Sequence, residues 1–357
     1  MSRVRGRRAV IGWVAIAALV GLSPGPAQAM RMGPPPPPGA VVFATARDGH
    51  SQIYLINDDG TGLRRLSSGG YGDTHPVFSP DGRFIAFSKT DRAADVIHWV
   101  RSIWVMNADG SGARQLTSGV QTDIEPVWSP DGKQLAFTRV ANGNARIWLM
   151  NPDGSHQRQL RTSDPKAVDY RPTYSPDGRQ LAFTSVSYDK TGENADIWLV
   201  DVDGSHLRRL TDTADYDSDA SFSPDGRQIA FVTGRNGNGD IWTMDVDGTY
   251  QRQLTTDPAI DTAPAYSPDG SRIVFASNRR GGRGDLWVMN TDGTDQTCLT
   301  TDAAADTDPS WTGSPASLGH SHAVTANSLA TLPPPAGCLE PDPAATLAQF
   351  TPTGPEG

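Results

Sequence analysis

Six aspartates recur along the chain at intervals of 44 to 50 residues, and residues of varying type follow two positions after each of them. The constant set is Asp73, Asp123, Asp169, Asp217, Asp261 and Asp306. The variable set is His75, Glu125, Arg171, Asp219, Ala263 and Asp308. A repeated carboxylate suits a structural role, in which it accepts backbone N–H bonds and fixes a loop. It equally suits an acidic ring that attracts cations or a basic peptide.

Histidines offer a second kind of chemistry. His50, His75 and His98 fall close to the first two aspartates of the series, and neutral imidazoles with the Asp73 carboxylate suit zinc or another transition metal. The intervals of 25 and 23 residues match no compact metal motif, so solvated loop histidines are the competing interpretation. We assign no metal from the sequence.

Signatures of nucleophilic or cofactor-dependent catalysis are missing from the sequence. It contains no Gly-x-Ser-x-Gly elbow and no Gly-rich phosphate loop followed by Lys-Ser or Lys-Thr. The Asp-x-Asp-Gly segments resemble the start of a calcium loop but lack its terminal glutamate, and we interpret them as turns. We therefore expect no catalytic residue and no cofactor.

The elements that position these residues come from an internal repeat. Ser-Pro-Asp-Gly occurs at 79, 129, 175, 223 and 267, and a period of this length is typical of propellers and solenoids. Each unit holds four short apolar or aromatic pieces bounded by Gly, Asp, Asn or Pro, which predicts four strands. In one unit they are Pro126 to Trp128, Leu135 to Phe137, a segment centred on Trp148, and Arg158 to Leu160.

The ends of the repeat region predict a closed ring. The first unit begins at its second strand near Val41, and the last unit stops after a lone first strand, Pro309 to Trp311. If that strand completes the first unit, six blades of four strands result and no long edge is left open. The predicted fold is all-β, a six-bladed β-propeller whose C-terminal strand closes the first blade.

Two Asp-Gly hairpins per blade must share one face of such a ring, which we call the hairpin face. The opposite face, the variable face, carries the loops between blades and between the second and third strands. Loops on a rigid scaffold often carry binding residues. The long inter-strand loops expected there are 88–102, 184–196 and 277–285. Trp99, in the first of them, is a candidate exposed anchor for a partner.

The flanking segments are of other kinds. Residues 1–29 combine a basic stretch, an apolar run from Ala9 to Leu22 and a small-x-small site after Ala29, as in a secretory signal peptide; a retained anchor is the alternative. Residues 30–40 form a Pro-rich lead-in to the propeller at 41–312, and 313–357 is a low-complexity tail that we expect to be disordered. Cys298 and Cys338 either form a disulfide or remain a buried thiol and a tail thiol.

Composition limits the partners. The formal charge is −9, and loss of the four N-terminal arginines with the leader makes it more negative, so a phosphate backbone is repelled and no nucleic-acid partner is expected. Apart from the run at Ala9 to Leu22, no apolar run approaches spanning length, so no stable membrane span is expected after cleavage.

The repeats resemble those of TolB-type β-propellers, relatives of the WD-type repeat. Trp128 to Phe137, then Ile147 to Asn151 and Asp153-Gly154, shows most of the pattern: an aromatic, Ser-Pro-Asp-Gly, an apolar strand, Ile-Trp and an Asp-Gly turn. The resemblance covers about 41 to 312. It implies a propeller scaffold in the periplasm or outside the cell that binds another protein or ligand. No room exists between Ala29 and Val41 for the α/β domain that precedes the propeller in TolB.

Together these features predict an exported, non-catalytic scaffold that is secreted, periplasmic or attached to the cell envelope. Its partner is a protein or peptide, basic or associated with the envelope, or a small ligand, bound at the variable face and channel mouth. The candidate ligand contacts are His75, Glu125, Arg171, Asp219, Asp308 and Trp99, with the six constant aspartates as an acidic ring. The alternative is a metal-assisted lyase or hydrolase with its site at the same mouth.

Overall fold

The computed structural model describes residues 36–37, 39–92, 99–160, 167–189, 192–281 and 284–313. The chain divides into two compact units, 1–31 and 32–357, and all the described residues lie in the second. The predicted signal peptide, His98, Cys338 and almost all of the predicted tail therefore fall outside the described residues. Within these ranges the regular structure is entirely β, and no helix is found that would cross a membrane.

Twenty-four strands form six four-stranded antiparallel sheets, the six blades of a β-propeller. Blade 1 comprises β24 (Asp306–Trp311), β1 (Val41–Thr45), β2 (Gln52–Ile56) and β3 (Arg64–Arg65). Blade 2 comprises β4 (Gly72–Phe78), β5 (Phe84–Arg92), β6 (Trp99–Asn107) and β7 (Arg114–Gln115). Blade 3 comprises β8 (Thr122–Trp128), β9 (Leu135–Ala141), β10 (Asn144–Met150) and β11 (Arg158–Gln159).

The other three blades repeat this order. Blade 4 comprises β12 (Val168–Tyr174), β13 (Gln180–Asp189), β14 (Gly192–Asp201) and β15 (Arg208–Arg209). Blade 5 comprises β16 (Asp217–Phe222), β17 (Gln228–Thr233), β18 (Asp240–Asp245) and β19 (Arg252–Gln253). Blade 6 comprises β20 (Asp261–Tyr266), β21 (Arg272–Ser277), β22 (Asp285–Asn290) and β23 (Thr297–Cys298).

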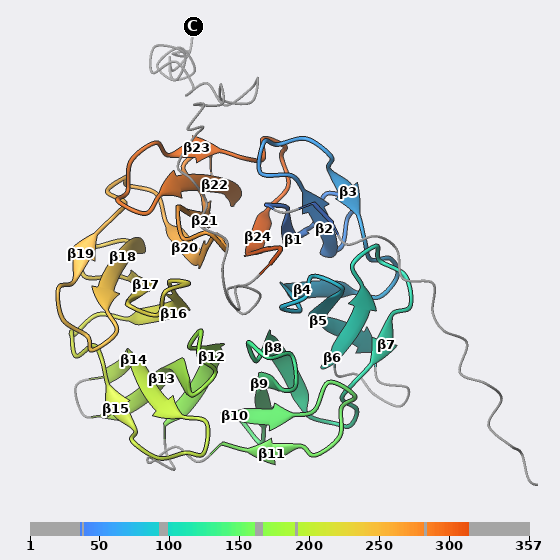
Figure 1. Cartoon of the computed structure of the whole chain (residues 1–357), viewed down its shortest axis with the longest axis horizontal. Coiled ribbons are helices and arrows are strands. Elements are labelled where there is room, and N and C mark those ends of the chain that lie inside the picture. Colours follow the sequence, from blue (N-terminus) through green and yellow to red (C-terminus); the bar gives the residue numbers. More distant parts are fainter. Residues whose placement is uncertain are drawn as a thin grey trace, which may run out of the picture. The chain divides into compact units, whose positions relative to one another are not determined.

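The blades surround a central channel, with the first strand of each blade innermost and the two-residue strand outermost (Figure 1). The predicted closure is confirmed: β24 pairs antiparallel with β1, and Val41 lies opposite Trp311. The C-terminal strand thus supplies the inner strand of the blade that the N-terminal strands begin.

The inner strands are longer than the sequence predicted, because they begin at or before the constant aspartates. A β-bulge makes this possible. In blade 2 the register shifts between Thr74 and Val77, so Pro76 lies where the ladder needs no backbone N–H. The equivalent shift occurs in the other five blades, which places the variable residues, such as His75, at the bulge.

The core lies between blades. Phe78 and Phe87 of blade 2 pack in one buried cluster with Val42 and Ile53 of blade 1, and similar clusters join the other blades. In blades 2 to 6 a first Asp-Gly hairpin joins the first two strands, and in each blade a second joins the third strand to the fourth. The second approaches the previous blade closely: a Cβ at Gly154, whose φ is +87°, would lie 2.4 Å from the carbonyl oxygen of Leu116. Only glycine fits there without moving backbone.

Two of the segments expected as long loops are mostly strand. β5 and β6 pair as far as Arg92 and Trp99, and β13 and β14 pair as far as Asp189 and Gly192. Trp99 therefore begins a strand instead of lying in a loop, because the ladder continues past the point where the repeat pattern ends.

Candidate functional site

The six constant aspartates are buried at the start of the inner strands. Asp73, Asp169, Asp217, Asp261 and Asp306 are fully buried, and Asp123 is 3% exposed. Burial raises the pKa of Asp261 and of Asp306, although Arg279 and Arg47 respectively oppose this effect. These carboxylates line the interior of the blades, so they are not presented to a ligand at the channel mouth.

Each of these aspartates faces a basic side chain. The ion pairs are Asp73–Lys89 (3.4 Å), Asp123–Arg139 (2.7 Å), Asp169–Arg146 (3.9 Å), Asp217–Arg235 (3.3 Å), Asp261–Arg279 (2.8 Å) and Asp306–Arg47 (3.1 Å). The neighbouring cations cancel much of the negative potential expected of an acidic ring, since the charges lie within a few ångströms of each other. The constant aspartates therefore have a structural role, but they fill it through salt bridges with side chains as well as through any bonds to loop backbone.

In five blades the basic group also stacks on the aromatic residue of the third strand. The Arg139 guanidinium lies 4.5 Å from the centre of the Trp148 ring, and Arg235 and Arg279 lie at the same distance from Trp242 and Trp287. Lys89 and Arg47 occupy similar positions over Trp104 and Tyr54. Each such blade is tied through an aspartate, a cation and an aromatic ring.

Sequence reasoning missed these cations. The available signal was a basic residue two or four positions after the buried phenylalanine of the second strand: Lys89 and Arg139 at two, Arg47, Arg235 and Arg279 at four. Blade 4 has Ser185 at this position, and its hydroxyl donates to Asp169 at 2.8 Å.

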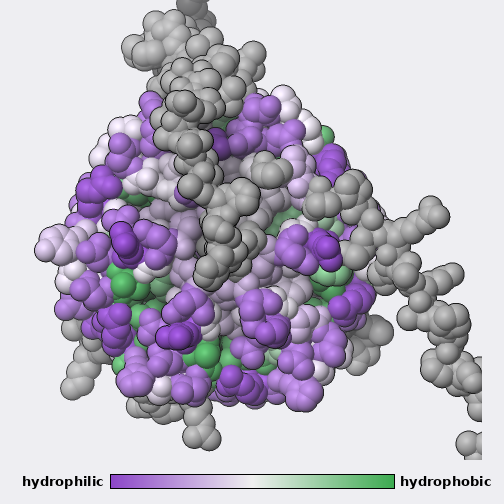
Figure 2. All heavy atoms as spheres, in the orientation of Figure 1, coloured by the Kyte–Doolittle hydropathy of each residue, from purple (hydrophilic) through white to green (hydrophobic). Residues whose placement is uncertain are grey.

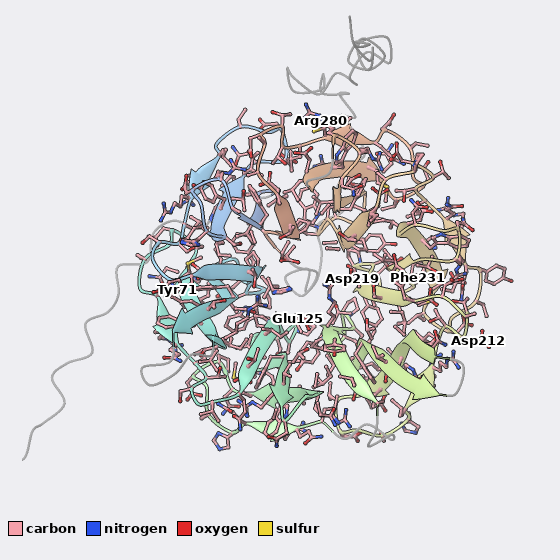
Figure 3. All side chains as sticks on the ribbon, turned by 180° about the vertical axis from the view of Figure 1, so that it is seen from behind. Tyr71, Glu125, Asp212, Asp219, Phe231 and Arg280 are labelled. Carbon is pink, nitrogen blue, oxygen red and sulfur yellow. The ribbon has the colours of Figure 1, made fainter. Side chains whose placement is uncertain are left out.

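The variable residues, by contrast, line the central channel. His75, Glu125, Arg171, Asp219, Ala263 and Asp308 all border one cavity of about 250 Å³. All six have a positive φ of 51° to 58°, the left-handed conformation that the bulge imposes. Glu125 and Asp219 point toward the central opening in Figure 3. We call these six positions the channel ring.

Acidic and basic side chains alternate around most of the channel ring. The His75 Nε2 atom lies 3.7 Å from Asp308 Oδ1 and 4.0 Å from Glu125 Oε1. Arg171 follows, with its Nε 3.5 Å from Glu125 Oε1, and also pairs with Asp219. The backbone N–H of Arg171 and the Thr138 hydroxyl donate to Glu125 Oε2 at 2.9 and 2.8 Å, which fixes that carboxylate.

Ala263 interrupts this alternation. Its methyl group brings neither charge nor hydrogen-bonding capacity, and its neighbours in the channel ring, Asp219 and Asp308, are both carboxylates. The ring holds three carboxylates, Glu125, Asp219 and Asp308, so it carries more negative than positive charge whether or not His75 is protonated. The arrangement is suited to receiving a cationic side chain beside Ala263.

The structure does not bring the candidate metal ligands together. His50 lines a separate cleft with Tyr71 and Arg101, whereas His75 lies in the channel. His98 lies outside the described residues, as does the side chain of Trp99. Across the described ranges no group of three or more His, Cys, Asp or Glu side chains is arranged to hold a metal ion.

Blade count, closure and channel together define a six-bladed β-propeller with a polar, asymmetric ring in its channel. Residues 162–256 and 220–322 match the family model described as the TolB beta propeller domain. The repeats in this part of the chain are therefore TolB-type propeller repeats, and the similarity concerns the propeller portion.

Solved structures show the same fold. TolB from Acinetobacter baumannii is 24% identical with a TM-score of 0.64, and the match covers 77% of this chain and 66% of that one. Putative TolB from Agrobacterium tumefaciens is 22% identical with a TM-score of 0.58, over 77% and 91% of the two chains. Kuenenia stuttgartiensis hydrazine synthase is 18% identical with a TM-score of 0.65, over 78% and 48%. The chain thus spans just under two thirds of the Acinetobacter protein.

Proposed function

We infer that this protein is an exported, non-catalytic scaffold that binds a protein or peptide segment through the channel ring, at the mouth on the variable face. The observation that carries the inference is the contrast between two sets of residues on the same strands. The constant aspartates are buried in salt bridges. The channel ring, two positions later in each blade, borders a cavity and varies in residue type, with only blades 5 and 1 sharing an aspartate. A specific site needs such asymmetry.

The chemistry of the channel ring indicates the kind of partner. Asp219 and Asp308 flank Ala263, so an arginine or lysine side chain entering beside Ala263 meets two carboxylates. Arg171 and His75 are already engaged with neighbouring acids. The site therefore favours a basic segment of a protein in the periplasm, the envelope or the medium.

The test uses a fluorescent oligo-arginine peptide and an oligo-glutamate peptide of equal length. Only the basic peptide should bind. Its affinity should fall as salt reduces the Debye length from about 10 Å toward 3 Å. Replacing Glu125→Gln together with Asp219→Asn should weaken binding roughly tenfold, since two of the three ring carboxylates lose their charge.

A matched control removes the same charge elsewhere. Asp212 and Asp215 are exposed and belong to a loop between blades, and Asp212 lies at the outer edge of the ring of blades (Figure 3). Asp212→Asn with Asp215→Asn should leave binding almost unchanged. If both double variants lost the same affinity for the peptide, overall charge and not the channel ring would explain the effect. If affinity fell only when residues of the hairpin face were replaced, the site would lie on that face.

Export has a separate test. Amino-terminal sequencing of the protein recovered from outside the cytoplasm should begin at Met30. A chain that still carries Ala9 to Leu22 would instead support the retained anchor.

A further inference from the structure

Neighbouring blades meet on the hairpin face in six equivalent places. The repeat places one residue at the start of the second strand of a blade and an aromatic residue at the end of the inner strand of the next blade. By sequence position these residues are Ala40 and Phe78, Phe84 and Trp128, Gln134 and Tyr174, Gln180 and Phe222, Gln228 and Tyr266, and Arg272 and Trp311. Four of these pairs share a buried cluster, a cleft or a direct contact: Ala40 with Phe78, Phe84 with Trp128, Gln134 with Tyr174, and Arg272 with Trp311.

Polar groups occupy most of these places. The Tyr174 hydroxyl donates to Gln134 Oε1 at 2.9 Å, and the Arg272 guanidinium lies 5.2 Å from the centre of the Trp311 ring. Phe84 replaces the Gln or Arg of blades 3 to 6, so the groove between blades 2 and 3 is the place where two aromatic rings meet.

This groove is an apolar cleft with a volume of about 440 Å³. Its walls combine the rings of Phe84 and Trp128 with the side chains of Pro80, Pro130 and Pro152. Phe84 is partly exposed, and Trp128 is 8% exposed. Figure 2 shows mainly hydrophilic residues over the face it presents, with hydrophobic residues in separate small areas.

Aromatic rings set between prolines favour one kind of ligand. A polyproline II segment is extended, already ordered and free of internal hydrogen bonds, and its pyrrolidine rings pack on flat aromatic surfaces. It loses little conformational entropy on binding. The Arg114 side chain, which donates to the Pro152 carbonyl at 3.1 Å, also lines the cleft, as do Asp81 and Asp131.

We propose that the groove between blades 2 and 3 is a polyproline II docking site, and that its occupant is the segment Leu332-Pro333-Pro334-Pro335 of the same chain. The described chain ends at Gly313, which follows β24 on the hairpin face: a Cβ at Gly313 would lie 3.7 Å from Pro268, in the first hairpin of blade 6. The groove opens on this same face, between the first hairpins of blades 2 and 3.

The tail is long enough for this docking. Nineteen residues lie between Gly313 and Pro333, and this stretch reaches on the order of 65 Å when extended. A compact domain the size of this propeller has a radius of gyration of roughly 18 Å, so the whole hairpin face is within reach. Attachment to the chain also gives the segment a high effective concentration at the groove.

The other proline run is held elsewhere. The carbonyl oxygen of Pro37 accepts hydrogen bonds from the Ala40 N–H and the Thr312 hydroxyl, which fix Pro37 at blade 1.

Docking of Pro333 to Pro335 also decides whether Cys338 can form a disulfide. Cys338 follows Pro335 by three positions, so docking would hold it near blades 2 and 3, whereas Cys298 is buried in β23 of blade 6. The proposal excludes a Cys298–Cys338 disulfide.

Photo-crosslinking in the full chain tests the proposal. A photoreactive amino acid replaces Arg83, which is exposed beside Phe84; the control places it at Arg227, the equivalent residue of blade 5. Crosslinks from position 83 to peptides containing Pro333 to Pro335 are expected within single chains, at a yield independent of concentration. Position 227 should give at least about fivefold less.

Two variants complete the design. Phe84→Gln installs the residue that blades 3, 4 and 5 carry at this position, so the blade should fold, yet the crosslink yield should fall about fivefold or more. Serine at all three of Pro333, Pro334 and Pro335 should have the same effect. Equal yields from positions 83 and 227, an unchanged yield in Phe84→Gln, crosslinked dimers at a yield that rises with concentration, or a Cys298–Cys338 disulfide would each overturn the proposal.

Discussion

The backbone N–H of Thr312 donates to the carbonyl oxygen of Ala40 at 2.7 Å, joining residues from opposite ends of the described chain. This bond continues the ladder of β24 and β1 beyond its last pair, Val41 and Trp311. The Trp311 indole N–H also donates to the carbonyl oxygen of Ala265, in blade 6. The C-terminal strand therefore holds blade 1 together and links it to blade 6.

Deleting residues 305–357 should consequently destabilise the propeller strongly. Blade 1 loses its inner strand, and β1 becomes an unpaired edge. A second deletion, of 314–357 alone, keeps β24 and serves as the control. Thermal unfolding followed by circular dichroism should show a large loss of melting temperature only in the longer deletion, and equal stability of the two would contradict closure.

The Asp123–Arg139 pair predicts the cost of leaving a buried carboxylate alone. Two Arg139 nitrogens donate to the two Asp123 oxygens at 2.7 and 2.8 Å. Arg139→Met keeps an unbranched stem but removes the charge, so the free energy of unfolding should fall by about 3 kcal/mol. Arg83→Met breaks an exposed pair with Asp81 and should change it by less than about 0.5 kcal/mol. Urea denaturation measures both, and similar effects would argue against the structural role of the buried pairs.

Asp285 predicts a dependence of stability on pH. Burial raises the pKa of this carboxyl to about 6, so the folded state holds a proton that the unfolded state has already lost. Its contribution to stability is therefore fully present below about pH 3.8, the ordinary pKa of the carboxyl, and is lost as pH rises through about 6. Asp285→Asn should raise the free energy of unfolding at pH 7.5, by at most about 3 kcal/mol, and change it little at pH 4.

Asp292 provides a control of opposite sign. Hydrogen bonds from the Thr294 side chain and backbone lower the pKa of Asp292, so its ionised form favours folding. Asp292→Asn should therefore reduce stability at pH 7.5. If both substitutions changed the free energy of unfolding at pH 7.5 in the same direction, burial of Asp285 would not be what governs its titration.

The positive φ of Ala263 gives a further prediction. Its φ is 52°, which costs energy for any residue with a Cβ atom. Ala263→Gly should increase the free energy of unfolding by about 0.5 to 1 kcal/mol. Ala265 lies two residues further along the same strand and pairs with Val274. Ala265→Gly should reduce stability by a similar amount. Guanidinium unfolding of the two variants compares them directly, and loss of stability in both would contradict the argument.

The repeat itself predicted much of the fold. Ser-Pro-Asp-Gly recurs because its groups satisfy one another locally: the Ser79 hydroxyl donates to Asp81 and accepts from the Phe84 N–H. Such contacts span a few residues, so they leave a readable pattern at every turn. Strand number, blade number and closure by Pro309 to Trp311 followed from that pattern. The bulge did not follow from the pattern. The proline at Pro76 indicated the start of the inner strand, whereas in the structure the strand continues past it with a shift in register.

Only the tertiary structure decided which polar residues are buried and which line the channel. Asp123 and Glu125 are two positions apart, yet one binds Arg139 inside its blade and the other contacts Arg171 of the next blade across the ring. The groove of Phe84 and Trp128 likewise joins residues of different blades. The sequence by itself determined the repeating strands and turns, because their interactions are local. The site depended on contacts between distant residues, which exist only after the ring has closed.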